Sequence, residues 1–102
     1  MKEVYRVIFQ DAFEREKNRW CNAGGLMELK REYDNLEDAK RCMNKFIENR
    51  LRRSNTTVVN GIGITFETTS EFERKFLDFE VKIEKRQVTP WEEVESKKNT
   101  VK

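Results

Sequence analysis

Six acidic side chains lie close together in the second half of this sequence: Glu67, Glu71, Glu73, Asp78, Glu80 and Glu84. Paired carboxylates can bind a divalent cation or share acid–base work in catalysis. Asp78, Glu80 and Glu84 would share one face of a strand, but Lys82 lies among them. Regular alternation with apolar residues is typical of the solvent-facing side of a strand. We therefore expect neither a catalytic pair nor a metal site here.

The sequence contains no histidine, which limits the catalytic mechanisms and metal sites that are possible. This absence excludes catalysis by Ser-His-Asp or Cys-His arrangements and most zinc and iron sites. The two cysteines, Cys21 and Cys42, are too few for a tetrathiolate site, and the first residues lack the apolar run of a signal peptide. We expect a cytoplasmic protein with two reduced thiols, no metal, no cofactor and no enzymatic activity.

A polar segment with a composition typical of recognition loops runs through residues 18–25, Asn-Arg-Trp-Cys-Asn-Ala-Gly-Gly. A tryptophan offers a flat contact surface, an arginine offers a planar cation, and glycines leave backbone N–H groups accessible. We therefore choose Arg19, Trp20 and Asn22 as partner-binding candidates. The alternative is that Trp20 folds over a thin core, as large aromatic residues commonly do.

A basic stripe is the second candidate surface. Residues 39–53 contain six basic side chains and one acid, and Arg41, Lys45 and Arg52 fall on a narrow outer line at 100° per residue. Together with Arg53, this line could follow the phosphates of a nucleic acid. The alternative is an exposed helix face with ordinary ion pairs at four-residue spacing.

Arg50 differs from the other basic residues of this segment, because it projects within the same arc as the apolar Met43 and Phe46. Either its aliphatic stem runs past the edge of a sheet, or its guanidinium meets an acidic partner. We add Arg50 to the partner-binding candidates, since with Arg19 and Trp20 it could also clamp a phosphate and a base.

Length and composition indicate that one small domain positions these residues. The chain has 102 residues, 39% of them charged and 36% hydrophobic, with a formal net charge of +2. Leu, Ile, Val and Phe make up about a quarter of the chain, above the roughly 20% typical of disordered chains. No segment approaches the roughly 18 apolar residues of a membrane span.

Apolar alternation predicts four strands, over residues 3–13, 26–33, 58–68 and 75–86. The second follows Gly24-Gly25, a turn signal. Residues 71–79 are ambiguous, because Ser70 and Glu73 resemble a helix capping box. Strict alternation from Leu77 to Ile83 favours the strand.

Two helices are expected. The first spans 35–53, begins at Asp34 or Asn35, and places Leu36, Ala39, Met43, Phe46, Ile47 and Leu51 on one arc. The second is short and follows Thr89, where Thr-Pro-Trp-Glu is typical of a helix start. Residues 1–94 would form the domain, and residues 95–102 a flexible tail.

These elements predict an α+β fold, a β-β-α-β-β antiparallel sheet with the long helix on one face and a short C-terminal helix. The opposite face would carry Val4 and Ile8 without a second layer. An uncovered apolar face predicts a homodimer.

The favoured function is a small non-enzymatic protein-binding module. By analogy, it would block a host factor as accessory proteins of phages and mobile elements do. The alternatives are a nucleic-acid-binding protein that uses helix 39–53 and a small-ligand or nucleotide-binding protein. The near balance of charges gives little long-range attraction for a polyanion, which favours the protein partner.

Overall fold

The computed structural model describes residues 3–52, 64–66, 71–87 and 90–101. Their elements, in chain order, are β1 (Val4–Asp11), α1 (Ala12–Glu16), β2 (Cys21–Asn22), α2 (Ala23–Met27), α3 (Leu36–Arg52), β3 (Ile64–Phe66), α4 (Glu71–Leu77), β4 (Phe79–Arg86) and β5 (Glu92–Val101). The strands form one sheet in the order β2-β1-β4-β5-β3. All neighbouring strands are antiparallel except β3 and β5, which are parallel. The α+β class with one long helix over the sheet is confirmed.

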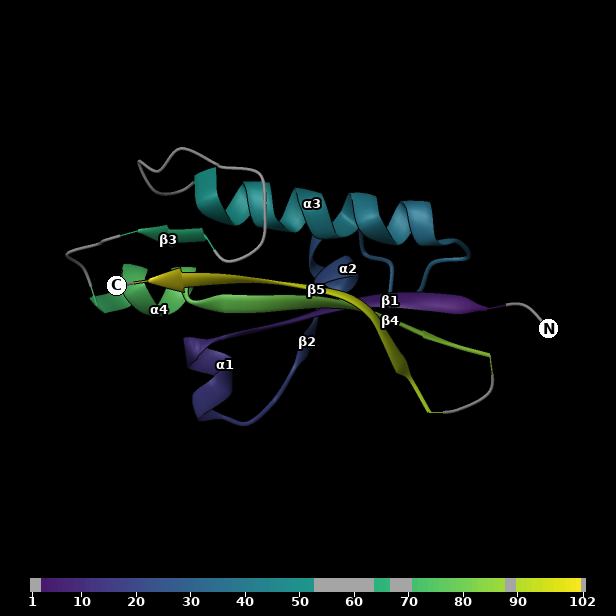
Figure 1. The fold of residues 1–102 in the computed structure, drawn as a ribbon, viewed down its shortest axis with the longest axis horizontal. Helices are drawn as coiled ribbons and strands as arrows, with labels where there is room; N and C mark the ends of the chain where they lie inside the picture. Colours follow the sequence, from purple (N-terminus) through teal and green to yellow (C-terminus); the bar gives the residue numbers. More distant parts are fainter. Residues whose placement is uncertain (1–2, 53–63, 67–70, 88–89, 102) are drawn as a thin grey trace.

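Helices cover the sheet unequally. Figure 1 shows α3 and the short α2 on one side of the sheet and α1 on the other. The core therefore forms between α3 and the sheet, where the central strands β1 and β4 contribute Val7, Phe9, Phe79, Val81 and Ile83.

The long helix α3 follows the sequence prediction closely. The side chain of Asn35 accepts a hydrogen bond of 2.9 Å from the backbone N–H of Asp38, so Asn35 caps the helix. Ala39, Met43 and Phe46 are buried as expected, and Leu36 and Ile47 pack partly against the same core. The Phe46 ring lies 4.6 Å from the ring of Phe9 and 5.7 Å from that of Phe79, which ties α3 to both central strands.

The first predicted strand, 3–13, ends two residues early. Asp11 closes β1, and its Oδ1 accepts a 2.8 Å hydrogen bond from the backbone N–H of Glu14. This bond caps α1 and turns the chain off the sheet.

The second predicted strand, 26–33, is wrong. Asn22 caps α2 by accepting a 2.7 Å hydrogen bond from the N–H of Gly25. Gly24 is required by close packing, because a Cβ there would lie 2.3 Å from the carbonyl oxygen of Lys30. Only Tyr33 reaches the sheet, through an isolated bridge to Tyr5. The glycine pair belongs to a short packed helix and does not mark a hairpin turn.

The helix signal and the strand signal found in residues 71–79 are both correct, because a helix comes first and a strand follows it. Helix α4 ends at Leu77, which is buried, and strand β4 begins at Phe79. The predicted strand 75–86 is therefore correct from Phe79 onward. The predicted strand 58–68 is confirmed over Ile64–Phe66, and its other residues lie outside the described part of the chain.

The predicted helix after Thr89 is a strand. Residues 92–101 form β5, which pairs with β4 from Phe79 to Lys85. Seven cross-strand pairings outweigh the local preference for a helix of about two turns, which is marginal by itself. The predicted tail is likewise wrong for residues 95–101, and the short helix in this part of the chain is α4.

The sheet face opposite α3 is mainly polar. Ile8 is only 8% exposed and Val4 is half-buried. Arg6 forms an ion pair of 2.5 Å with Glu84, and its guanidinium lies 4.3 Å from the ring centroid of Trp91. The two apolar side chains that motivated a homodimer therefore form no open apolar patch, and self-association stays a prediction.

Replacing Phe46 with alanine should lower the free energy of unfolding by about 3–5 kcal/mol, because the ring fills the space between α3 and two strands. Urea denaturation followed by circular dichroism measures this loss. The exposed neighbour Lys45→Ala is the control and should stay within about 0.5 kcal/mol of wild type. An unchanged midpoint for Phe46→Ala would contradict the assigned core face.

Candidate functional site

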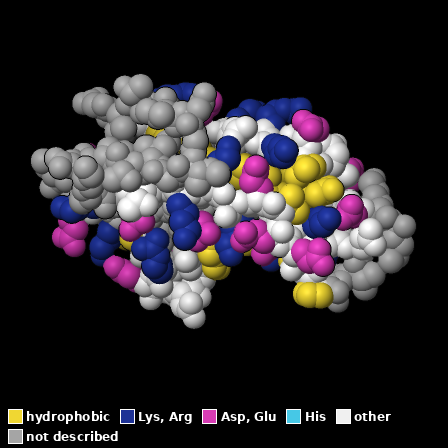
Figure 2. Space-filling model, in the orientation of Figure 1, with side chains coloured by type: hydrophobic (Ala, Val, Ile, Leu, Met, Phe, Trp, Pro, Cys, Tyr) yellow, Lys and Arg dark blue, Asp and Glu magenta, His cyan; other side chains and the backbone are white. Residues whose placement is uncertain are grey.

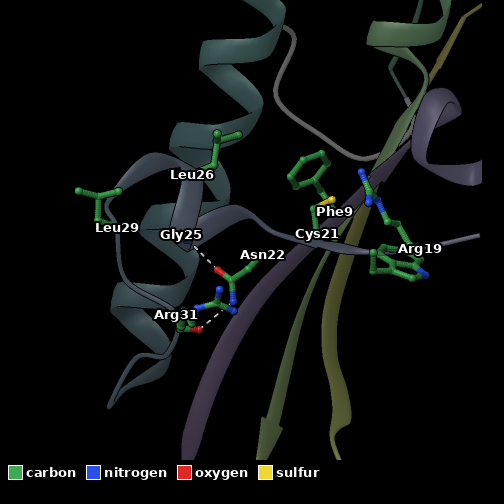
Figure 3. A pocket seen from close by; sticks show the side chains of 9 residues that line it. Phe9, Arg19, Cys21, Asn22, Gly25, Leu26, Leu29 and Arg31 are labelled. Atoms are coloured by element: carbon green, nitrogen blue, oxygen red, sulfur yellow. Dashed lines mark hydrogen bonds between the residues drawn. The ribbon is translucent and has the colours of Figure 1, made fainter. Parts of the chain in front are cut away.

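A hollow in the described surface has a volume of about 720 Å³. It is lined by Phe9, Arg19, Trp20, Cys21, Asn22, Gly25, Leu26, Leu29 and Arg31. We call this surface the Trp20 hollow. Figure 3 shows that its walls come from two sources: Gly25, Leu26 and Leu29 from α2 and the turn after it, and Phe9 and Cys21 from the sheet. Three of the four predicted partner-binding residues therefore lie together.

Asn22 shapes the hollow through hydrogen bonds made by both its side-chain oxygen and its side-chain nitrogen. Its Oδ1 accepts the hydrogen bond from Gly25, and its Nδ2 donates a 3.0 Å hydrogen bond to the carbonyl oxygen of Arg31 (Figure 3). Asn22 also pairs with Ile8 in the sheet. Asn22 therefore positions the loop, and its role in partner binding stays a prediction.

Arg19 and Trp20 lie where the chain returns from α1 to the sheet. Asn18 adopts a left-handed φ of 53°, which reverses the chain direction. Arg19 is exposed and forms an ion pair with Glu14, which lowers the pKa of that carboxyl and raises the pKa of the guanidinium. Trp20 is half-buried, with Nζ of Lys82 4.3 Å from its ring centroid. Part of its aromatic surface remains available in the hollow.

Two exposed leucines were missed by sequence reasoning. Leu26 is 63% exposed and Leu29 is 92% exposed, because both lie on α2 and its following turn. The incorrect strand 26–33 had treated Leu29 as one of its alternating apolar residues. Leu29 also has a φ of 55°, a conformation that costs a branched side chain about 1–2 kcal/mol. Leu29 is therefore both highly exposed and held in a costly backbone conformation.

The charge of the Trp20 hollow has one sign. Arg19 and Arg31 line it, and no aspartate or glutamate does so among the described residues. Arg31 was also missed, because the predicted strand gave it no special position. The hollow therefore combines an apolar floor with two arginines, of which Arg19 is paired with Glu14.

Cys21 is a half-buried thiol in the wall of the hollow. Burial is the largest cause that raises its pKa above the ordinary value, and the negative charge of Glu14 raises it further, while Arg19 opposes this change. A raised pKa leaves less reactive thiolate at neutral pH. Cys21 is thus a slow nucleophile whose accessibility reports on the hollow.

Arg50, the fourth partner-binding candidate, belongs to the core. It is 9% exposed, and its Nη1 donates a 2.8 Å hydrogen bond to Oδ2 of Asp11 and a 3.1 Å bond to the carbonyl oxygen of Phe76. Four aromatic rings lie within 6 Å of its guanidinium carbon: Phe9, Phe46, Phe76 and Phe79. Arg50 is thus buried and paired and lies apart from Arg19 and Trp20, so its role in partner binding stays a prediction. It faces a separate hollow of about 340 Å³ that shares only Leu26 with the first.

The basic stripe is partly neutralised. Arg41 forms a 3.0 Å ion pair with Asp38, while Lys45 and Arg52 are exposed. Arg53 lies outside the described residues. Acidic and basic side chains are interspersed over the face shown in Figure 2. One arginine of the described stripe is therefore neutralised, and the use of the stripe for phosphate contacts stays a prediction.

Two members of the acidic set considered first form ion pairs in the structure. Asp78 pairs with Arg15 at 3.3 Å, and Glu84 pairs with Arg6. The described residues contain no group of three or more potential metal ligands. Within the same residues, no helix combines the length and apolar character needed to cross a membrane.

The Arg50–Asp11 ion pair should be essential for stability. Asp11→Asn keeps an oxygen that can cap α1 but leaves the guanidinium buried without its counter-charge, at a cost of about 3–5 kcal/mol. Urea denaturation measures the loss. Arg41→Met, which removes an exposed arginine from the same helix, should change stability by no more than about 0.5 kcal/mol. Equal effects of the two substitutions would contradict this assignment.

Labelling by a thiol reagent should be slow at pH 7 and should modify Cys21 before the fully buried Cys42. The rate should rise with pH around a midpoint above that of a free cysteine, because the pKa is raised. Glu14→Gln removes a negative neighbour and should shift that midpoint to lower pH. Mass spectrometry of labelled peptides follows the labelling of each cysteine. An unchanged pH profile of Cys21 labelling in Glu14→Gln would contradict the contribution of Glu14 to the raised pKa.

Comparison with known proteins gives no relative from which a role can be transferred. No family model matches the chain, and the searches of curated proteins and of solved structures also give no significant match. The functional argument therefore depends on the geometry of the Trp20 hollow.

Proposed function

We propose that this chain is a non-enzymatic protein-binding module and that the Trp20 hollow is its partner-binding surface. The observation that carries the proposal is Leu29, which is 92% exposed and held in a left-handed conformation. Strain of this kind persists only where surrounding structure imposes it, and it gathers at binding sites. Beside Leu29 lie Leu26, Trp20 and two arginines. Tryptophan and arginine are the residues most enriched among binding hot spots.

The shape of the surface favours a macromolecular partner. A site for a small molecule usually encloses most of its ligand, whereas the leucines of this wall project into solvent. Apolar side chains that project beside a hollow match the interlocking surfaces of protein complexes. We further propose that the module blocks a host factor by binding to its functional surface. This step rests on analogy with accessory proteins of phages and mobile elements.

The helix stripe is the weaker surface for this role. Arg41 is already paired with Asp38, and a partner would have to break that pair to use it. Arg50, which a nucleotide clamp would need, is held by Asp11 in the core. The proposal therefore places binding on the loop and its leucines.

Affinity capture from an extract of the source organism tests the proposal when variants are compared in parallel. Trp20→Ala should weaken the captured complex about thirtyfold, equivalent to about 2 kcal/mol for a hot-spot tryptophan. Trp91→Ala is the matched control, because Trp91 is also half-buried and lies beneath two arginines, outside the hollow. It should bind as wild type does. Titration of the purified partner by calorimetry gives the affinities.

Leu29→Asn separates binding from folding. Asparagine tolerates a left-handed φ better than leucine, so the free energy of unfolding should stay level or rise by up to about 1 kcal/mol while the affinity falls. A complex that survives both Trp20→Ala and Leu29→Asn would overturn the proposal. So would equal losses in Trp20→Ala and Trp91→Ala.

A further inference from the structure

We infer that the partner presents an acidic segment with one large apolar side chain, which enters the Trp20 hollow between flanking carboxylates. This inference rests on the proposed function and specifies the chemistry of the partner. Its basis is the combination of an apolar floor, two arginines in the lining, and a set of neighbouring acids that already have partners.

The positive charges lie around the hollow and not at its floor. Arg19 and Arg31 belong to the lining, and Figure 3 shows them on either side of Cys21 and Asn22. The ammonium of Lys82 lies 4.3 Å from the ring centroid of Trp20, which is part of the same lining, but it also forms a 3.7 Å ion pair with Glu93. An extended segment that crosses the hollow would therefore meet Arg31 on one side and, on the other, Arg19 with its partner Glu14.

The acids nearest in sequence to these cations have partners of their own. Glu14 holds Arg19, Glu28 accepts a 3.1 Å hydrogen bond from the hydroxyl of Tyr33, and Glu32 forms a 3.3 Å ion pair with Arg86. The guanidinium of Arg31 makes no ion pair within the described part of the chain and is exposed. Arg31 is thus the cation best placed to receive a carboxylate from outside.

The floor of the hollow calls for an apolar group. Phe9 is 6% exposed and closes the base, while Leu26 and Leu29 stand above it with large exposed fractions. An apolar side chain that enters here removes leucine surface from water, worth about 25 cal/mol per Å². A phosphate backbone would gain nothing from this surface, because its contacts are ionic. The pairing of carboxylates with an apolar anchor uses both features together.

Selection from a random displayed peptide library against the full chain tests this chemistry without a known partner. Recovered peptides should be enriched in aspartate and glutamate beside one leucine, phenylalanine or tryptophan. A synthetic copy of a recovered peptide, labelled with a fluorophore, gives affinities by fluorescence polarisation. The same peptide should slow the labelling of Cys21, which locates it in the hollow.

Arg31→Glu is the decisive variant. Reversing this charge should lower the affinity for the selected acidic peptide about tenfold. It removes one exposed ion pair between Arg31 and a peptide carboxylate and adds one repulsion of similar size. A repeated selection against Arg31→Glu should recover lysine and arginine in place of acids. Arg41→Glu reverses an exposed arginine on α3, away from the hollow, and should keep the acidic preference.

The outcomes separate this inference from the proposed function. Peptides that protect Cys21 and need Trp20 and Leu29 but show no acidic preference overturn the inference and leave the proposed function standing. Acidic peptides that bind without protecting Cys21 overturn both. A single-stranded oligothymidylate that protects Cys21 better than the peptides, and loses affinity in Arg31→Glu, would identify the surface as a nucleic-acid site and also overturn both.

Discussion

A buried ion pair between Arg50 and Asp11 connects four elements of this small protein. Asp11 ends β1, and one of its oxygens caps α1 while the other accepts the guanidinium of Arg50 from α3. The same guanidinium nitrogen reaches the carbonyl oxygen of Phe76 in α4. Removing charges from water is costly, so such a pair persists only with good geometry and further contacts. Here the surrounding phenylalanine rings supply those contacts through their faces.

The candidate site depends on this pair through the path of the chain. Asp11 sets the direction of α1, the left-handed Asn18 returns the chain, and Arg19 and Trp20 follow before β2 rejoins the sheet. Asn22 acts as Asp11 does, because its side chain caps the next helix, α2. Leu29 lies in the turn after this helix. The side chains of Asp11 and Asn22 thus start the two short helices α1 and α2, and the residues after these caps line much of the Trp20 hollow.

The sequence was informative where one strong period covered a long segment. Helix α3 was predicted nearly to its ends because its apolar arc and its cap agree. Arg19 and Trp20, which were chosen by composition, both line the Trp20 hollow. The sequence was misleading where contacts distant along the chain decide the outcome. Strand β5 carries no apolar alternation and depends on pairing with β4. Gly24 looked like a turn because nothing local reveals that Lys30 leaves no room for a side chain. Arg50 could not be assigned to the core without knowledge that Asp11 lies opposite it.

The segment that carries the leucines is attached to the sheet at both ends by pairing with one strand. Asn22 pairs with Ile8 and Tyr33 pairs with Tyr5, so both anchors lie on β1. Residues 25–31 between them contribute surface more than core, in keeping with the greater tolerance of surface loops to change. Substitutions in this segment can therefore change the shape and charge of the hollow while the pairing of the sheet stays intact.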